Sequence, residues 1–364
     1  MNKEKIVVAM SGGVDSSVAA ALLKKQGYFV IGIFMKFWKE GKSIENRCCS
    51  VESEKLARLV AKKIDIPFYV INVEKEFKKK VVDYFLKEYK KGNTPNPCVV
   101  CNKEIKFGLL INRALKMGAE FIATGHYAQT SLGNQIFLLA KNLLPRLFKS
   151  KDQDKDQSYF LWQLNQKQLS RVLFPVGNYT KSEVRVLAKK FKLPTAKTPE
   201  SQEVCFIQNT TNDFLKKYLK SKPGNIIDVN KKILGKHQGL WFYTIGQRRG
   251  IGFSGGPYFV VAKDLKKNNL IISKNEKDLE RKKLIASNVN WILPQKLPIN
   301  AEVKIRYKSN FVKAKISDFE KNHSASLRAS KVKIVFQKPQ KAVTPGQSVV
   351  FYKGQELLGG GVIE

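Results

Sequence analysis

The most restrictive feature of this sequence stands near its start, where a short apolar run leads into a glycine-rich turn. The run from Ile6 to Ala9 is β-branched and predicts a strand, and the Ala- and Leu-rich stretch 18–23 predicts a helix. Between them lies Ser-Gly-Gly-Val-Asp-Ser, residues 11–16. Glycines let backbone N–H groups approach a ligand closely, and a helix start adds unpaired donors and a positive dipole end. This strand–turn–helix predicts an anion-binding site.

The turn differs from a Walker phosphate loop because it contains no lysine. Ser11, Ser16 and Ser17 offer hydroxyl donors, and Asp15 is suited to hold a cation bound to phosphate oxygens. The plainer alternative is a Gly-Gly turn in which Asp15 and Ser16 are ordinary helix N-caps. The complete pattern at the end of a first strand favours the anion site.

Strands and helices alternate through roughly the first third of the chain. Strands are expected at 29–34, 68–73 and 121–124, and helices at 51–63 and 77–89. This alternation predicts an α/β fold, a doubly wound parallel sheet with ligands at the carboxyl ends of its strands. Both the glycine-rich turn and Gly125–His126 fall at such ends.

The pattern changes past Pro223 to short β-type runs separated by Gly, Pro and Asn. Runs at 303–307, 314–316, 333–336 and 348–352 predict a small β-barrel. We therefore expect three parts: an α/β domain with the predicted anion site over 1–208, a small central linker domain over 209–280, and a C-terminal β-barrel over 281–364.

The charge balance indicates the class of partner. Lys and Arg number 66 against 30 Asp and Glu, a net charge of +36, which attracts polyanions and above all nucleic acid. Only 11 of the 66 are Arg, so a lysine-rich proteome is an alternative source of the excess. No apolar run approaches the ~18 residues that span a bilayer, and no signal peptide is visible. We expect a cytoplasmic protein without a membrane partner.

The five cysteines suit catalysis or metal binding better than structural disulfides in such a protein. Cys98 and Cys101 form a C-x-x-C pair, which is found in redox and zinc sites. A zinc site needs a second pair, and Cys48–Cys49 is too tightly spaced to provide it, so we predict no metal site.

Two prolines, Pro95 and Pro97, disfavour helix just before these cysteines. Cys101 is therefore expected in a loop ahead of a helix. There, the helix start and the neighbouring Lys103 and Lys106 favour a nucleophilic thiolate.

Six motifs occur in order along the chain. They are the 11–16 turn, Thr94–Phe107, Lys155–Phe160 with Glu203–Ile207, Tyr243–Gly250, and Thr344–Gln347. The turn resembles the PP-loop of ATP pyrophosphatases. The whole set, from Val7 to Gly361, resembles the tRNA-specific 2-thiouridylases.

The resemblance implies a PP-loop ATP-dependent sulfurtransferase that adenylates the C2 oxygen of the wobble uridine in tRNA and then adds sulfur. Cys205 matches the cysteine that carries the persulfide, and Cys101 matches the catalytic nucleophile. The pair ends a cycle as a disulfide that must be reduced. The implied cofactor is ATP with Mg²⁺. The implied partners are tRNA and a persulfide donor, either a cysteine desulfurase or a sulfur-relay protein.

Other positions are assigned by the same resemblance, residue by residue. The ATP-binding positions are Ala9, Met10, Ser11, Gly12, Gly13, Val14, Asp15, Ser16, Met35 and Gly125. The segment facing the target base is Asn96, Pro97 and Cys98. The tRNA contacts are His126, Lys155, Asp156, Gln157, Arg306, Tyr307 and Gln347.

One departure concerns Cys98, where many family members carry an Asp assigned as catalytic acid or base. A thiol stays largely protonated near neutral pH, whereas a carboxylate is ionised. Either Cys98 transfers protons less well, or the step needs no side-chain base. On the residues alone two rival functions stay open: a PP-loop synthetase for a small metabolite, and a non-enzymatic RNA-binding protein that senses nucleotide.

Overall fold

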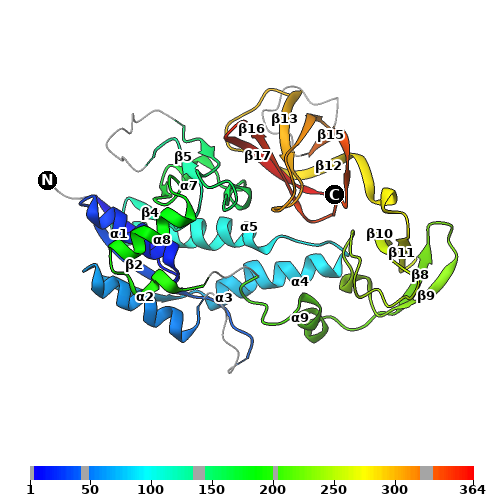
Figure 1. Cartoon of the computed structure of the whole chain (residues 1–364), viewed down its shortest axis with the longest axis horizontal. Helices are drawn as coiled ribbons and strands as arrows, with labels where there is room; N and C mark the ends of the chain where they lie inside the picture. The colour runs from blue at the N-terminus through cyan, green and yellow to red at the C-terminus, as the bar shows by residue number, and fades with distance from the viewer. Residues whose placement is uncertain (1–3, 42–48, 134–143, 200–203, 320–330) are drawn as a thin grey trace. The chain divides into compact units, whose positions relative to one another are not determined.

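The computed structural model describes residues 4–41, 49–133, 144–199, 204–319 and 331–364 (Figure 1). The chain divides into two compact units. The first comprises residues 1–81, 98–208 and 354–358, and the second 82–97, 209–353 and 359–364. Within the described ranges, no helix has the length and apolar character needed to cross a membrane. The three-part division 1–208, 209–280 and 281–364 stays a prediction.

A five-stranded parallel sheet organises the first unit, in the order β3-β2-β1-β4-β7. Its strands are β1 (Lys5–Ala9), β2 (Phe29–Lys36), β3 (Phe68–Asn72), β4 (Phe121–Ala123) and β7 (Val172–Leu173). β1 pairs with β2 on one side and β4 on the other, so the strand order reverses next to β1. In such sheets the loops at the reversal point diverge and leave room for a ligand. The predicted doubly wound sheet is confirmed.

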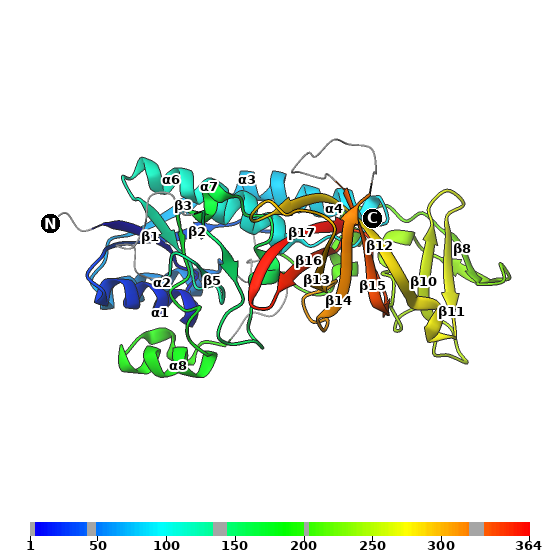
Figure 2. The same cartoon turned by 90° about the horizontal axis from the view of Figure 1, so that it is seen from above.

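Helices cover both faces of this sheet. Figure 2 shows α6 (Leu110–Lys116) on one face and α1 (Val14–Lys25) and α8 (Lys181–Lys190) on the other. α1 is almost wholly buried, which its run of small and apolar residues allows. α2 (Val51–Lys63) is capped by Ser50, whose side chain accepts a hydrogen bond from the Ser53 N–H. Its bounds are those expected from the sequence.

The helix expected at 77–89 has three consecutive parts, α3 (Glu74–Phe77), a π-helical stretch Lys78–Val82, and α4 (Asp83–Lys90). Short elements of the first unit include β5 (Gln129–Thr130), β6 (Leu147–Phe148) and α7 (Gln166–Leu169). Residues 356–357, at the start of β17, pair with β6.

The second unit contains a small sheet and a barrel. The sheet has the order β10-β11-β8-β9, with β8 (Gly224–Asp228), β9 (Ile233–His237), β10 (Phe259–Asp264) and β11 (Asn269–Ser273), and α9 (Thr211–Tyr218) precedes it. Ile226, Val260, Leu270 and Ile272 form its core. This is the central part expected from the sequence.

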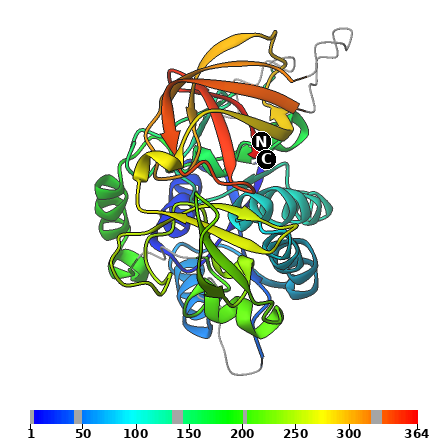
Figure 3. The same ribbon diagram turned by 90° about the vertical axis from the view of Figure 1, so that its right-hand side faces the viewer.

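The barrel strands follow the order β12-β15-β14-β13-β16-β17, and β12 also pairs with β17 to close the ring (Figure 3). They are β12 (Glu280–Trp291), β13 (Ile299–Lys304), β14 (Val312–Asp318), β15 (Lys331–Lys341), β16 (Ser348–Lys353) and β17 (Glu356–Ile363). The predicted barrel is confirmed. The prediction of a strand at 303–307 is partly wrong, because β13 ends at Lys304 and Arg306–Tyr307 lie in the turn after it.

Candidate functional site

The glycine-rich turn is a rigid bend between β1 and α1. Gly12 has φ +77°, and a Cβ there would lie 2.3 Å from the backbone oxygen of Ser53, so only glycine fits. Gly13 is the N-cap of α1, and its carbonyl accepts hydrogen bonds from the hydroxyls of Ser16 (3.1 Å) and Ser17 (2.8 Å). The reading of Asp15 and Ser16 as N-caps is therefore wrong.

Because Gly13 has no side chain, the first-turn N–H groups of α1 have no side-chain acceptor from their N-cap residue. Those groups are the donors that a helix start offers to an anion. The loop after β4 packs directly on this start, since a Cβ on Gly125 would lie 2.5 Å from the Ser16 nitrogen. The two loops at the reversal point of the sheet thus meet at one place.

A cavity of about 180 Å³ opens where these loops meet. Its walls combine backbone donors, hydroxyls and one carboxylate with an apolar patch from the end of β2. Residues predicted to bind ATP that line it are Ala9, Met10, Ser11, Asp15, Ser16, Met35 and Gly125. Gly12, Gly13 and Val14 form the turn itself and do not line the cavity. The other lining residues are Phe34, Phe37, Lys106, Thr124, His126 and Gln157.

Four of these, Phe34, Phe37, Lys106 and Thr124, were not predicted to lie at the nucleotide site, and Lys106 was expected only as a neighbour of Cys101. A signal existed for Phe37, which stands two residues after Met35 at the carboxyl end of β2. The sequence contains no such signal for Lys106, because this residue lies in the π-helical stretch Asn102–Leu109 and not at the end of a strand.

His126 and Gln157, both expected to contact tRNA, lie on the cavity wall. Thr124 Oγ1 is 2.8 Å from His126 Nδ1, and the ring packs against Phe107 and Phe174. Burial, and to a smaller extent the charge of Lys106, lowers the pKa of His126 well below its usual value. The imidazole is therefore neutral near pH 7.

In the neighbouring stretch 155–157, the side chains of Asp156 and Gln157 hydrogen-bond mainly to other parts of the protein. Gln157 Oε1 accepts a hydrogen bond from the Tyr127 N–H at 3.0 Å. Asp156 is buried, and its carboxylate accepts hydrogen bonds from Ser158 Oγ (2.7 Å) and the Ser150 N–H (3.0 Å). Lys155 is half-buried, with its backbone N–H directed to Asp152. Of this predicted tRNA-contacting stretch, Lys155 alone carries a cation.

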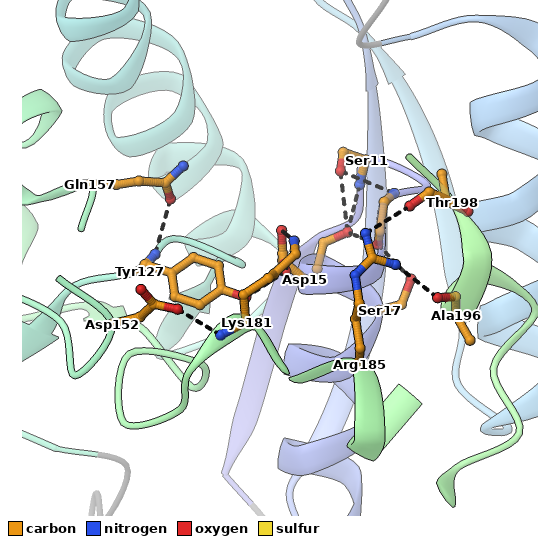
Figure 4. Close-up of polar contacts among 12 residues, drawn as sticks. Ser11, Asp15, Ser17, Tyr127, Asp152, Gln157, Lys181, Arg185, Ala196 and Thr198 are labelled. Carbon is orange, nitrogen blue, oxygen red and sulfur yellow. Dashed lines mark hydrogen bonds and ion pairs between the residues drawn. The ribbon is translucent and has the colours of Figure 1, made fainter. Parts of the chain in front are cut away.

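Asp15 accepts three hydrogen bonds, two from Lys181 Nζ (2.7 and 2.8 Å) and one from the Tyr127 hydroxyl (2.8 Å) (Figure 4). The cation at this carboxylate is thus an ammonium from α8. The described residues contain no group of three or more His, Cys, Asp or Glu arranged to hold a metal ion.

Cys101 does not lie in a loop, so that expectation is wrong. α5 begins at Pro97 and ends at Cys101, and the chain continues through the π-helical stretch into α6. Proline is well accepted at the first helical position, where its missing N–H has no partner to lose. Cys101 is buried at 8% exposure, whereas Cys98 on the same short helix is exposed.

Cys205 lies in a turn and is partly exposed. Its neighbour Phe206 is buried and packs edge-on against Phe77, with ring centroids 5.8 Å apart. Phe77 in turn packs 4.9 Å from Phe37, a cavity wall residue. This aromatic chain anchors the Cys205 turn to the cavity wall.

Gln347 belongs to a clamp within the second unit. Its side-chain amide donates to the carbonyl of Thr94 at 2.7 Å, and the Thr94 N–H donates to the Pro345 carbonyl at 2.9 Å. The Thr94 hydroxyl is 3.3 Å from that of Thr244. The clamp fixes the residues just before Asn96 and Pro97, the segment expected to face the target base.

The chain matches three family models along its length. They are described as tRNA methyl transferase HUP domain (residues 4–209), tRNA methyl transferase PRC-barrel domain (212–274) and Aminomethyltransferase beta-barrel domain (281–363).

Similar proteins include the tRNA-specific 2-thiouridylase MnmA of Carboxydothermus hydrogenoformans, 44% identical, with 100% of this chain and 98% of the relative covered. That of Halothermothrix orenii is 49% identical, with 99% of each covered. A solved 4-thiouridine synthetase–RNA complex with bound ATP matches 56% of this chain and 45% of its own at 17% identity and a TM-score of 0.35, too slight a likeness to bear on function.

Proposed function

Because this chain belongs to the tRNA-specific 2-thiouridylase family, we propose that it thiolates C2 of the wobble uridine in tRNA at the cavity beside the glycine-rich turn. The observation that carries the proposal is the convergence of the 11–16 turn, the α1 start and Gly125 on that cavity, in a chain with full-length thiouridylase relatives. The family uses ATP.

The first step we propose is adenylation. ATP supplies the adenylyl group that activates the uridine C2 oxygen, with pyrophosphate as leaving group. The open N–H groups of the α1 first turn and the hydroxyls of Ser11 and Ser16 bind the phosphates. Phe34 and Met35 give an apolar wall suited to the adenine base.

Sulfur transfer follows in the proposal. A persulfide on Cys205 is attacked at its inner sulfur by the Cys101 thiolate, which forms a Cys101–Cys205 disulfide and releases hydrosulfide. The hydrosulfide attacks the activated C2, and AMP leaves. An external thiol reductant restores both cysteines, and a desulfurase or sulfur-relay protein supplies the next persulfide.

Mg²⁺ fits this site as a phosphate-bound ion. Asp15 is the carboxylate on the cavity wall, and Lys181 already neutralises it. Mg²⁺ often keeps several waters and binds through substrate phosphates with one or two carboxylates. Asp15 would be the protein group closest in type to that role.

We propose that tRNA is held by the cationic surface, with Lys155, Arg306 and Tyr307 among its contacts and Asn96, Pro97 and Cys98 facing the target base. A net charge of +36 supports a polyanionic substrate. Arg306 and Tyr307 lie in a turn rather than a strand, where their side chains reach a partner more readily.

Pyrophosphate release tests the proposed function. The enzyme should form pyrophosphate from ATP when uridine-34 tRNA is added, and tRNA from cells lacking the protein should lack 2-thiouridine by mass analysis. Pyrophosphate formation with a small metabolite and without tRNA would favour the synthetase alternative. Nucleotide binding without any turnover would favour the RNA-binding alternative.

A further inference from the structure

We propose that Lys181 binds the polyphosphate of the nucleotide and supplies, from α8, the cation that the glycine-rich turn lacks. The inference rests on the proposed nucleotide site and adds to it a residue that the sequence did not indicate. Lys181 stands 166 residues after Asp15, so spacing alone gave no reason to connect them.

The geometry places the ammonium at the start of α1. Lys181 Nζ lies 2.7 and 2.8 Å from the two carboxylate oxygens of Asp15, the second residue of α1 (Figure 4). The Tyr127 hydroxyl shares one of these oxygens, and the ammonium lies 5.7 Å from the Tyr127 ring centroid. Asp15 itself lines the cavity. A single carboxylate therefore separates the ammonium from the proposed phosphate position.

A lysine at position 181 does not stabilise α8 itself. Lys181 is the first residue of that helix, where a cation opposes the helix dipole, and its side chain is only 11% exposed. The helix start does not need it, since Thr180 and Glu183 already form a capping box. What compensates for this break of a local rule is the contact with Asp15 at the start of α1, so the reason for a lysine here lies at the glycine-rich turn and not in α8.

The charges converge on an anion larger than Asp15. The dipole ends at the starts of α1 and α8 are positive, as is the Lys181 ammonium, and Glu183 in the first turn of α8 is paired with Lys151. Among the described cavity-lining residues Asp15 is the one acidic side chain. A nucleoside triphosphate or pyrophosphate carries several negative charges and competes with this carboxylate for the same ammonium. Asp15 then acts as the counter-ion that keeps Lys181 in place between ligands.

Direct binding to the full chain without tRNA tests the inference. By isothermal titration calorimetry, Lys181→Met should weaken the binding of sodium pyrophosphate and of ATP by about tenfold or more, because a charge-assisted contact is lost. Affinity for adenosine should stay within about twofold, because that ligand carries no phosphate. Melting temperatures of all variants are measured in parallel.

Lys151→Met is the matched control. Lys151 also pairs with a carboxylate of the α8 first turn, Glu183, at 2.7 Å, but both side chains are about half exposed. It should bind pyrophosphate as the wild type does. Lys181→Arg keeps the charge and should recover most of the affinity lost in Lys181→Met.

Three results would overturn the inference: unchanged pyrophosphate affinity in Lys181→Met, an equal loss for adenosine, or Lys181→Arg binding no better than Lys181→Met. The first would make Lys181 only a partner of Asp15. A tenfold loss of pyrophosphate affinity in Lys181→Met supports the inference whether or not the wild type thiolates tRNA. The role of Lys181 and the proposed thiolation activity are therefore tested by separate measurements.

Discussion

Cys101 and Cys205 lie in different surroundings, a buried helical position and a partly exposed turn. We expect Cys101→Ser and Cys205→Ser each to lower thiolation with a persulfide donor by at least about a hundredfold, because each removes one partner of the sulfur transfer. tRNA affinity should be unchanged. Cys49, which is half-buried like Cys205, provides the control, and Cys49→Ser should stay active.

Peptide mapping after one turnover, without reductant, identifies the pair. A Cys101–Cys205 linkage is expected. A dominant Cys98–Cys205 linkage, or normal thiolation in either serine variant, would contradict the assignment. Cys98 lies within the same short helix as Cys101 and is the more exposed of the two thiols. Mapping therefore tests Cys101 against a neighbouring thiol that is easier to reach.

The neutral state of His126 predicts a pH dependence of stability. Its folded-state pKa lies well below its unfolded value, so the unfolded chain binds the extra proton first as the pH falls. The free energy of unfolding should decrease as the pH drops below about 6.5, with a limiting slope of about 1.4 kcal/mol per pH unit. His126→Asn should remove part of this slope. Denaturant titrations between pH 5 and 8 measure it, and an unchanged slope would contradict the prediction.

At the level of elements, the clamp of Gly346 and Gln347 on Thr94 joins the barrel to the residues before α5. A Cβ on Gly346 would lie 2.9 Å from Asn93 Cβ and 3.0 Å from the Thr94 nitrogen, at φ +90°. We expect Gly346→Ala to lower the free energy of unfolding by about 1–3 kcal/mol. Gly354→Ala is the control that separates backbone strain from steric crowding of the new methyl group. Gly354 also has a positive φ, but a Cβ added there would have no atom within 4 Å. Equal losses in the two variants would contradict a packing role for the clamp.

The elements also show what the sequence could predict. The glycine-rich turn, α2 and the barrel were predictable because the periodicity of apolar residues and the placement of glycines are local properties of a sequence. Cys101 was misplaced because the rule that proline disfavours helix applies to the preceding residue, whereas Pro97 begins α5. The strand at 303–307 was extended too far because an apolar Ile305 continues the pattern into a turn.

The cavity was predicted in part for a similar reason. Turn residues and strand ends are visible in one stretch of sequence, so Ser11, Asp15 and Gly125 were found. Lys106 and Lys181 were not placed at the cavity, because only the packed sheet brings their elements to the same place. Long-range pairing leaves no local signal in a single sequence.

At the level of the whole molecule, the net charge of +36 predicts salt-dependent tRNA binding. Affinity should fall steeply between about 50 and 200 mM salt, because each neutralised phosphate releases counter-ions. Lys155→Met or Arg306→Met should each weaken binding by ~1–3 kcal/mol and reduce the slope by about one. Filter binding across salt concentrations measures both. An affinity independent of salt would mean that the lysine excess is compositional.

The pairing of Lys181 with Asp15 also has a consequence for how the protein is made. The glycine-rich turn leaves the ribosome early, but its cation follows only after β7 and the start of α8 have been synthesised. A nascent chain that ends just before residue 181 contains the turn and all five strands of the parallel sheet without a complete anion site. The growing protein therefore gains its nucleotide site late, once nearly half of it has emerged.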